Sequence, residues 1–152
     1  MMYTTVLMPP MLLSPADSKA FFDQIYEDNL VKIPDASFAP RPSAHYVFSK
    51  DGSGSVVGGG FVQFNFDVAL IDVIWVSRRA RRLGLGREIY RAIERLAAQK
   101  GMRRAIVSTF EFQGAIPFWE KMGFESFAVL SDYPEGQRLI YFQKKISLVQ
   151  RD

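Results

Sequence analysis

The stretch VALIDVIWV-SRRARRLGLG-REIYRAIERLAAQKG, residues 68–101, decides the fold. Its first nine residues are apolar except for Asp72, which predicts a central strand covered on both faces. Its last fifteen residues repeat apolar side chains at the spacing of one buried helical stripe. Between them lies a basic turn, Arg81-x-x-Gly84-x-Gly86. The stretch therefore predicts a buried strand, a turn and an amphipathic helix that ends at a glycine.

The basic turn has the features of an anion site. Glycine lets the backbone approach a ligand closely, and a helix start directs N–H groups and the positive end of its dipole to one point. We therefore expect a phosphate there. The turn is not a P-loop, because no Lys-Ser or Lys-Thr follows the glycines. The turn is not a good dinucleotide fingerprint either. That fingerprint needs a third glycine where this chain has Ile89, and an acid where it has Ile106-Val107.

A second motif follows the helix, Gln113-x-x-x-x-Phe118-Trp119-x-x-x-Gly123-Phe124. The order of a strand, a basic glycine turn, a long helix, a second strand and this motif resembles the GCN5-related N-acetyltransferase family. Arg-x-x-Gly-x-Gly by itself is a loose pattern, whereas the two motifs in this order and at this spacing are fairly specific.

The resemblance extends over roughly residues 44 to 146 and implies the fold class. The expected fold is α/β, with a single mixed and mostly antiparallel sheet. A central parallel strand pair is splayed for acetyl-CoA, and helices cover both faces. We expect one domain, residues 1–152.

The rest of the chain is expected to supply the remaining elements of this domain. A helix should begin after Ser14 as its N-cap and run to about Leu30, with an apolar stripe that we interpret as core packing. Gly58-Gly59-Gly60 predicts a bulge or a close backbone approach. The patterns predict strands at 3–8, 45–50, 56–66, 68–76, 104–110, 126–130 and 138–146, helices at 85–100 and 113–122, and loops at 31–43 and 131–136.

Composition excludes several classes of protein. The chain has 152 residues, 48% of them hydrophobic, which is typical of a folded domain. It has no cysteine, which excludes disulfides, a thiolate nucleophile and Cys-ligated zinc. Its lone histidine, His45, is interpreted as structural or exposed, so no metal site is expected. The apolar start lacks a basic region and is interrupted by Pro9-Pro10. We therefore expect no signal peptide, no membrane span and a cytoplasmic location.

Positive charge is concentrated in one segment. Residues 78–104 contain ten Lys or Arg and two Glu, a local net charge of +8 in a chain with a total of +3, so the remaining residues sum to −5. Such a segment suits a phosphate-bearing cofactor, nucleic acid or a solvated helix face. We favour the cofactor for the arginines of the turn and a plain surface for Arg91 to Arg104, which makes a nucleic-acid partner the weaker interpretation.

The resemblance implies acetyl-CoA as the cofactor. Its pyrophosphate would lie on the basic turn and its pantetheine arm between the strands 68–76 and 104–110. A backbone N–H near Val76 would face the acetyl carbonyl. The implied cofactor-binding residues are Ile74, Trp75, Val76, Arg81, Arg82, Leu83, Gly84, Leu85, Gly86, Arg87, Thr109, Gln113, Phe118 and Trp119.

The candidate catalytic residues are Asp72 and Tyr133. The resemblance implies a carboxylate base on the strand before the turn, and Asp72 is the only ionisable side chain there, although an equal case exists for an Asp paired to an arginine or to a backbone group. Many relatives carry a tyrosine as the acid where this chain has Trp119, and an indole has no acid function near neutral pH. Tyr133 and Tyr141 are the substitutes, and a thiolate can also leave without an acid.

Three classes of function remain open. The leading one is an acetyl-CoA-dependent N-acetyltransferase acting on an amine of a small molecule or protein. The second is an acyl-CoA-binding domain without catalysis, which Trp119 suggests, and the third is a basic nucleic-acid-binding protein. The sequence does not identify the acceptor and leaves a homodimer open.

Overall fold

A computed structural model describes residues 14–32 and 42–147. The chain divides into two compact units, residues 1–37 and 38–152. The strand predicted at 3–8 and most of the loop predicted at 31–43 lie outside the described residues. A single domain over the whole chain stays a prediction.

The first unit contains helix α1, Pro15–Leu30. Its start follows the sequence signal, because the hydroxyl of Ser14 accepts a hydrogen bond from the N–H of Asp17 at 3.0 Å and a proline occupies the first turn. An ion pair between Lys19 and Asp23 spans one turn of the helix. The helix itself buries none of its residues, so core packing of its apolar stripe also stays a prediction.

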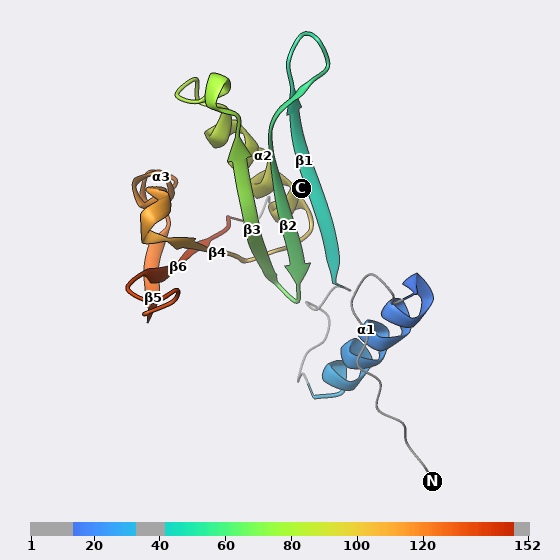
Figure 1. Cartoon of the computed structure of the whole chain (residues 1–152). Coiled ribbons are helices and arrows are strands. Elements are labelled where there is room, and N and C mark those ends of the chain that lie inside the picture. The colour runs from blue at the N-terminus through green and yellow to red at the C-terminus, as the bar shows by residue number, and fades with distance from the viewer. Residues whose placement is uncertain (1–13, 33–41, 148–152) are drawn as a thin grey trace. The chain divides into compact units, whose positions relative to one another are not determined.

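The second unit is built on one mixed sheet of six strands, in the order β1-β2-β3-β4-β6-β5 (Figure 1). Neighbouring strands are antiparallel except for the central pair β3 and β4, which is parallel. Flanking helices complete the fold class expected from the sequence. The strands are β1 Ser43–Lys50, β2 Val56–Asn65, β3 Val68–Val76, β4 Arg104–Phe110, β5 Glu125–Ser131 and β6 Arg138–Lys145.

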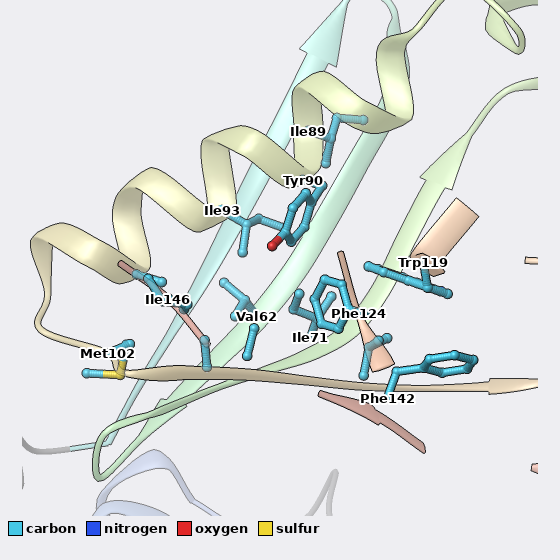
Figure 2. Close-up of a cluster of buried hydrophobic side chains, with 14 of the residues drawn as sticks. Val62, Ile71, Ile89, Tyr90, Ile93, Met102, Trp119, Phe124, Phe142 and Ile146 are labelled. Carbon is cyan, nitrogen blue, oxygen red and sulfur yellow. The ribbon is translucent and has the colours of Figure 1, made fainter. Parts of the chain in front are cut away.

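Helix α2, Leu85–Gln99, lies across β1, β2 and β3 and buries its apolar stripe against them. Figure 2 shows Ile89, Tyr90 and Ile93 directed from this helix toward the sheet, where they meet Val62 and Ile71. The helix ends as predicted, because Gly101 adopts a φ of +78° that other residues rarely adopt.

Glycines on β2 allow this close packing. A Cβ atom on Gly60 would lie 2.8 Å from Cδ1 of Ile93, and one on Gly58 would lie 2.9 Å from Cδ1 of Ile89. Close approach is therefore confirmed for Gly58 and Gly60. A bulge also lies directly beside them, because Ser49 of β1 pairs with Gly58 and Lys50 pairs with Val56, which leaves Val57 as an extra residue of β2. The bulge between β2 and β3 lies elsewhere.

The bulge falls at Asp72 on β3. Phe61 of β2 pairs with Val73 and the next residue, Val62, pairs with Ile71, so Asp72 is the extra residue. Beyond this point the expectation that both faces of β3 are covered is wrong, because Asp72, Val73 and Trp75 are exposed in this unit. The extra residue moves the following side chains to the opposite face of the strand.

The central parallel pair also ends at the bulge. β3 pairs with β4 only from Val68 with Arg104 to Ile71 with Val107. After that the two strands run apart, as Figure 1 shows. The predicted splay of the central pair is thus confirmed, and it begins where β3 gains its extra residue.

The short helix predicted at 113–122 begins later than expected. A 3-10 turn, η4 Glu111–Gln113, comes first and ends at Gly114 with a φ of +65°, and helix α3 spans Ile116–Lys121. Pro117 is thereby placed in the first turn of α3, where its missing N–H leaves no helical bond unmade. Trp119 and Phe124 then enter the core beside Tyr90, as Figure 2 shows.

We predict that Gly60→Ala destabilises the protein by about 1–3 kcal/mol, because the new methyl group overlaps the buried Ile93 side chain. The matched control is Gly52→Ala, since a Cβ atom at Gly52 meets no atom within 4 Å. Urea unfolding of both variants measures the difference. Equal stabilities would show that α2 does not require a glycine at this point.

Candidate functional site

The basic turn and the start of α2 enclose a groove of about 650 Å³, called the turn groove here. It contains nine of the predicted cofactor residues. Three further residues that sequence reasoning missed also line it, and one of them, Lys121, adds a positive charge from α3. The lining residues are Val76, Ala80, Arg81, Arg82, Leu83, Gly84, Leu85, Gly86, Arg87, Phe118, Lys121 and Met122.

The start of α2 is suited to bind an anion. Gly84 precedes the helix with a φ of 83° and provides no side-chain cap, so the first N–H groups of the helix face the turn groove without a side-chain acceptor. These donors and the helix dipole favour negative charge at this point. Arg82 also has a positive φ, 65°, which turns the chain sharply before the helix.

Two arginines of the turn hold its position. Arg81 donates from Nε to the carbonyl oxygen of Val76 at 3.0 Å, and Nη2 of Arg79 lies 2.8 Å from Oδ2 of Asp51 in the β1–β2 hairpin. The hydroxyl of Ser53, the N–H of Ser55 and more weakly Arg79 keep the pKa of Asp51 below its usual value. Asp51 therefore remains ionised at neutral pH and connects the hairpin to the turn.

A second space, called the strand cleft here, lies between the splayed halves of β3 and β4 and measures about 620 Å³. It shares Val76, Arg81, Gly86 and Phe118 with the turn groove, so the two spaces adjoin. A long ligand could therefore extend from one into the other. The lining residues are Asp72, Val73, Ile74, Trp75, Val76, Arg81, Gly86, Val107, Ser108, Thr109, Phe110, Gln113, Gly114, Ala115, Phe118, Trp119 and Leu139.

Every cofactor-binding residue predicted from the sequence lines one of these two spaces. Their placement agrees with the prediction, while binding itself stays a prediction. Ser108 and Lys121 are among the lining residues that sequence reasoning missed. The basic character of Lys121 near the second motif was the available signal for that residue.

Backbone groups of β3 face the strand cleft at Val76. The N–H of Ser77 donates to the carbonyl of Val57 on β2 at 2.9 Å. Because successive residues of a strand direct their backbone groups to opposite edges, Val76 directs its N–H and carbonyl away from β2. The hydrogen bond from Arg81 to the carbonyl of Val76 agrees with this direction. The N–H of Val76 is therefore a donor placed at the point where the turn groove and the strand cleft meet.

Asp72 lines the strand cleft as an exposed carboxylate. The side-chain amide of Gln63 on β2 donates a hydrogen bond to Oδ2 of Asp72 at 2.7 Å. The partner is therefore an amide side chain, and not the arginine or backbone group that the sequence suggested. The hydrogen bond orients the carboxylate without neutralising it. Asp72 is therefore held in position by Gln63 and open to the strand cleft.

Tyr133 and Trp119 occupy different surroundings. Tyr133 is 52% exposed, does not line the strand cleft, and packs against Phe110, which does, with ring centroids 5.8 Å apart. Trp119 is 4% exposed and packs edge-on against Phe118 and Phe124 at 4.9 and 5.2 Å. Trp119 thus serves the core and forms one wall of the strand cleft.

Thr109 and Gln113 fix the end of β4. The buried hydroxyl of Thr109 donates to Oε1 of Gln113 at 2.9 Å, and the same oxygen accepts the N–H of Phe110 at 2.9 Å. These bonds hold η4 against the end of the strand. Gln113 retains its side-chain N–H groups as donors toward a ligand.

The basic residues further along the chain lie at the surface. Arg91 and Arg95 are exposed on α2, and Arg104 donates to Gln143 on β6. None of these three lines the turn groove or the strand cleft. Among the helices in the described part of the chain, none is both long enough and apolar enough to cross a membrane.

Comparisons with known proteins agree with this geometry. The family model described as "Acetyltransferase (GNAT) family" matches residues 11–124. Over 86 residues the chain is 37% identical to blasticidin-S acetyltransferase of Streptomyces morookaense, and this match covers 55% of the chain. The match spans only 61% of the length of that relative.

Solved structures share the fold. An acetyltransferase from Bacillus cereus superposes with a TM-score of 0.74 at 24% identity, covering 95% of this chain and 99% of that one. Nourseothricin acetyltransferase superposes with a TM-score of 0.64 at 18% identity, covering 76% of this chain and 69% of that one. These likenesses concern the fold alone.

We predict that inorganic pyrophosphate binds the turn groove and that Gly86→Asp weakens this binding about tenfold or more, because it places a negative charge beside the helix start. Gly86→Ala is the matched control, since its Cβ atom would lie 3.4 Å from Phe118, an ordinary contact. Calorimetric titration provides the affinities. Equal affinity in folded Gly86→Asp protein would remove the anion site from this groove.

Proposed function

Because this chain belongs to the acetyltransferase (GNAT) family, we propose that it transfers the acetyl group of acetyl-CoA to a primary amine, directly in a ternary complex. One observation carries the proposal. A positively charged groove at a helix start adjoins a cleft between splayed parallel strands, so a phosphate-bearing thioester could extend from one to the other.

The residues present fit such a cofactor. The N–H groups at the start of α2, with Arg82, Arg87 and Lys121, would bind its phosphates in the turn groove. The unpaired edge of β3 after Ile71 offers backbone groups to an extended amide-containing arm in the strand cleft. Trp119 and Phe118 provide apolar walls for this arm.

The chemistry needs a polarised carbonyl and a path for protons. When bound, acetyl-CoA would supply an activated acyl group. The N–H of Val76 would donate a hydrogen bond to the acyl oxygen, on which negative charge develops during attack by the amine. Asp72 would accept a proton from the arriving ammonium, and Tyr133 is the candidate donor to the departing thiolate.

The acceptor is proposed to be a small molecule. The similar protein from Streptomyces morookaense is named for the compound blasticidin S, which supports a small-molecule amine. An acyl-CoA-binding domain without catalysis is the alternative, because the position occupied by the acid in many relatives holds the buried Trp119.

The test of the proposed function combines binding and turnover. Acetyl-CoA at about 100 times its Kd should raise the Tm by about 5–10 °C, because it binds only the folded protein. A panel of primary amines should then produce amine-dependent release of free thiol. Binding without thiol release for any amine would favour the alternative, and absence of binding would remove both.

We predict that Asp72→Asn lowers kcat/KM about 10²-fold, because the amide cannot accept the proton of an ammonium substrate. The acidic limb of the pH–rate profile should disappear in the same variant. Glu125→Gln, on the exposed β5 strand, is the control for loss of a surface carboxylate. A folded Asp72→Asn enzyme with a normal rate and pH profile would assign Asp72 a structural role with Gln63.

A separate prediction concerns Tyr133. Tyr133→Phe retains the ring that packs on Phe110 and removes only the hydroxyl. If that hydroxyl protonates the thiolate, kcat should fall about tenfold or more while the KM for the amine stays unchanged. An unchanged kcat would show that the thiolate leaves without help from this residue.

A further inference from the structure

Three aromatic rings gather at the end of β4. Phe110 and Phe112 stack with centroids 5.1 Å apart and an interplanar angle of 12°, and Tyr133 packs on Phe110 from the β5–β6 turn. Phe112 is 62% exposed and Tyr133 is 52% exposed, so two of the three rings present much of their surface to solvent. We call these three residues the aromatic cluster.

The aromatic cluster is held in a defined arrangement. Glu111 forms a two-pronged ion pair with Arg138 on β6, which fastens η4 to the sheet. Gln113 accepts the N–H of Phe110, as described above. On the other side, Asp132 accepts the N–H of Gly136 at 2.7 Å and orders the turn that carries Tyr133. The backbone segments that carry the exposed rings are therefore held by polar contacts on both sides.

The opposite wall of the strand cleft is also apolar and exposed. Trp75 is 48% exposed and lines the cleft from β3, and Val73 lies two residues before it. Phe110 lines the same cleft from β4, so aromatic side chains stand on both splayed strands. Exposed aromatic surface beside a cleft commonly marks a binding site.

Asp72 is the one carboxylate among the residues that line the strand cleft, and Arg81 lines the cleft at its junction with the turn groove. The side-chain amide of Gln63 donates to Oδ2 of Asp72 and orients the carboxylate. The neighbouring acids Glu111, Asp132 and Glu135 do not line the strand cleft, and Glu111 forms an ion pair with Arg138. The cleft thus combines the carboxylate of Asp72 with flat apolar walls, which suits a cation attached to a planar ring.

Building on the proposed function, we propose that the acceptor amine carries an aromatic or heteroaromatic ring a few bonds from its nitrogen. The aromatic cluster and Trp75 bind the ring, and Asp72 faces the nitrogen. Phe112 is then a specificity-determining residue, because it contacts the acceptor ring without touching the reacting atoms. Small polar amines lack the ring and gain nothing from these walls.

The experiment compares 2-phenylethylamine with propylamine, two primary amines of the same charge. Wild-type protein should favour the ring-bearing amine in kcat/KM by about tenfold or more, and Phe112→Ala should reduce this preference about 3- to 10-fold. Phe112→Tyr keeps the ring and should retain the preference. Phe127→Ala, which removes a comparably exposed ring on β5, is the matched control and should change nothing.

Direct binding separates this inference from the proposed function. Saturation-transfer NMR with 2-phenylethylamine should show ring contact that Phe112→Ala weakens, whether or not acetyl transfer occurs. Equal turnover or equal binding of the two amines by wild-type protein would overturn the ring-binding inference and leave acetyl transfer standing. Ring binding without any acetyl-CoA binding would overturn the proposed function and leave the ring site standing.

Discussion

The single extra residue in β3 is the constraint on which the site depends. At Asp72 the antiparallel pairing with β2 slips by one residue, and the parallel pairing with β4 ends at Ile71. A bulge bends the strand and increases its twist. The bend opens the strand cleft, turns the N–H of Val76 toward it, and exposes the carboxylate of Asp72 along its side. One local irregularity thus produces the space, a hydrogen-bond donor and a candidate base.

Such an opening is tolerated because the surrounding packing is tight. β3 stays paired with β2 along its length except at Asp72, and β4 stays paired with β6 from Arg104 to Phe110, so each splayed strand is supported on its outer edge. Gly58 and Gly60 bring α2 close onto the sheet and fix the helix start beside the cleft. The turn between β3 and α2 is short, so the end of the strand and the start of the helix lie close together. The turn groove and the strand cleft therefore adjoin and share lining residues.

Much of this arrangement follows from the sequence because its signals are local. Periodicity predicts α2 and the strands, and Arg81-x-x-Gly84-x-Gly86 predicts the anion site at the helix start. The bulge at Asp72 could not be predicted, because it depends on the register between β2 and β3. The apolar pattern of β3 predicts that Trp75 is buried, because the pattern does not reveal the extra residue at Asp72. The bulge moves Trp75 to the exposed face of the strand. The aromatic cluster joins Phe112 to Tyr133 through tertiary contacts that no spacing encodes.

The central claim is that the bulge directs the N–H of Val76 at the acyl oxygen of a bound thioester. A crystal structure with acetyl-CoA tests it most directly, through the distance between the nitrogen of Val76 and the acetyl carbonyl oxygen. The account predicts a hydrogen bond of about 2.9 Å, with the pyrophosphate on the N–H groups at the start of α2. A thioester bound outside the strand cleft, or a Val76 N–H paired with β4, would contradict it.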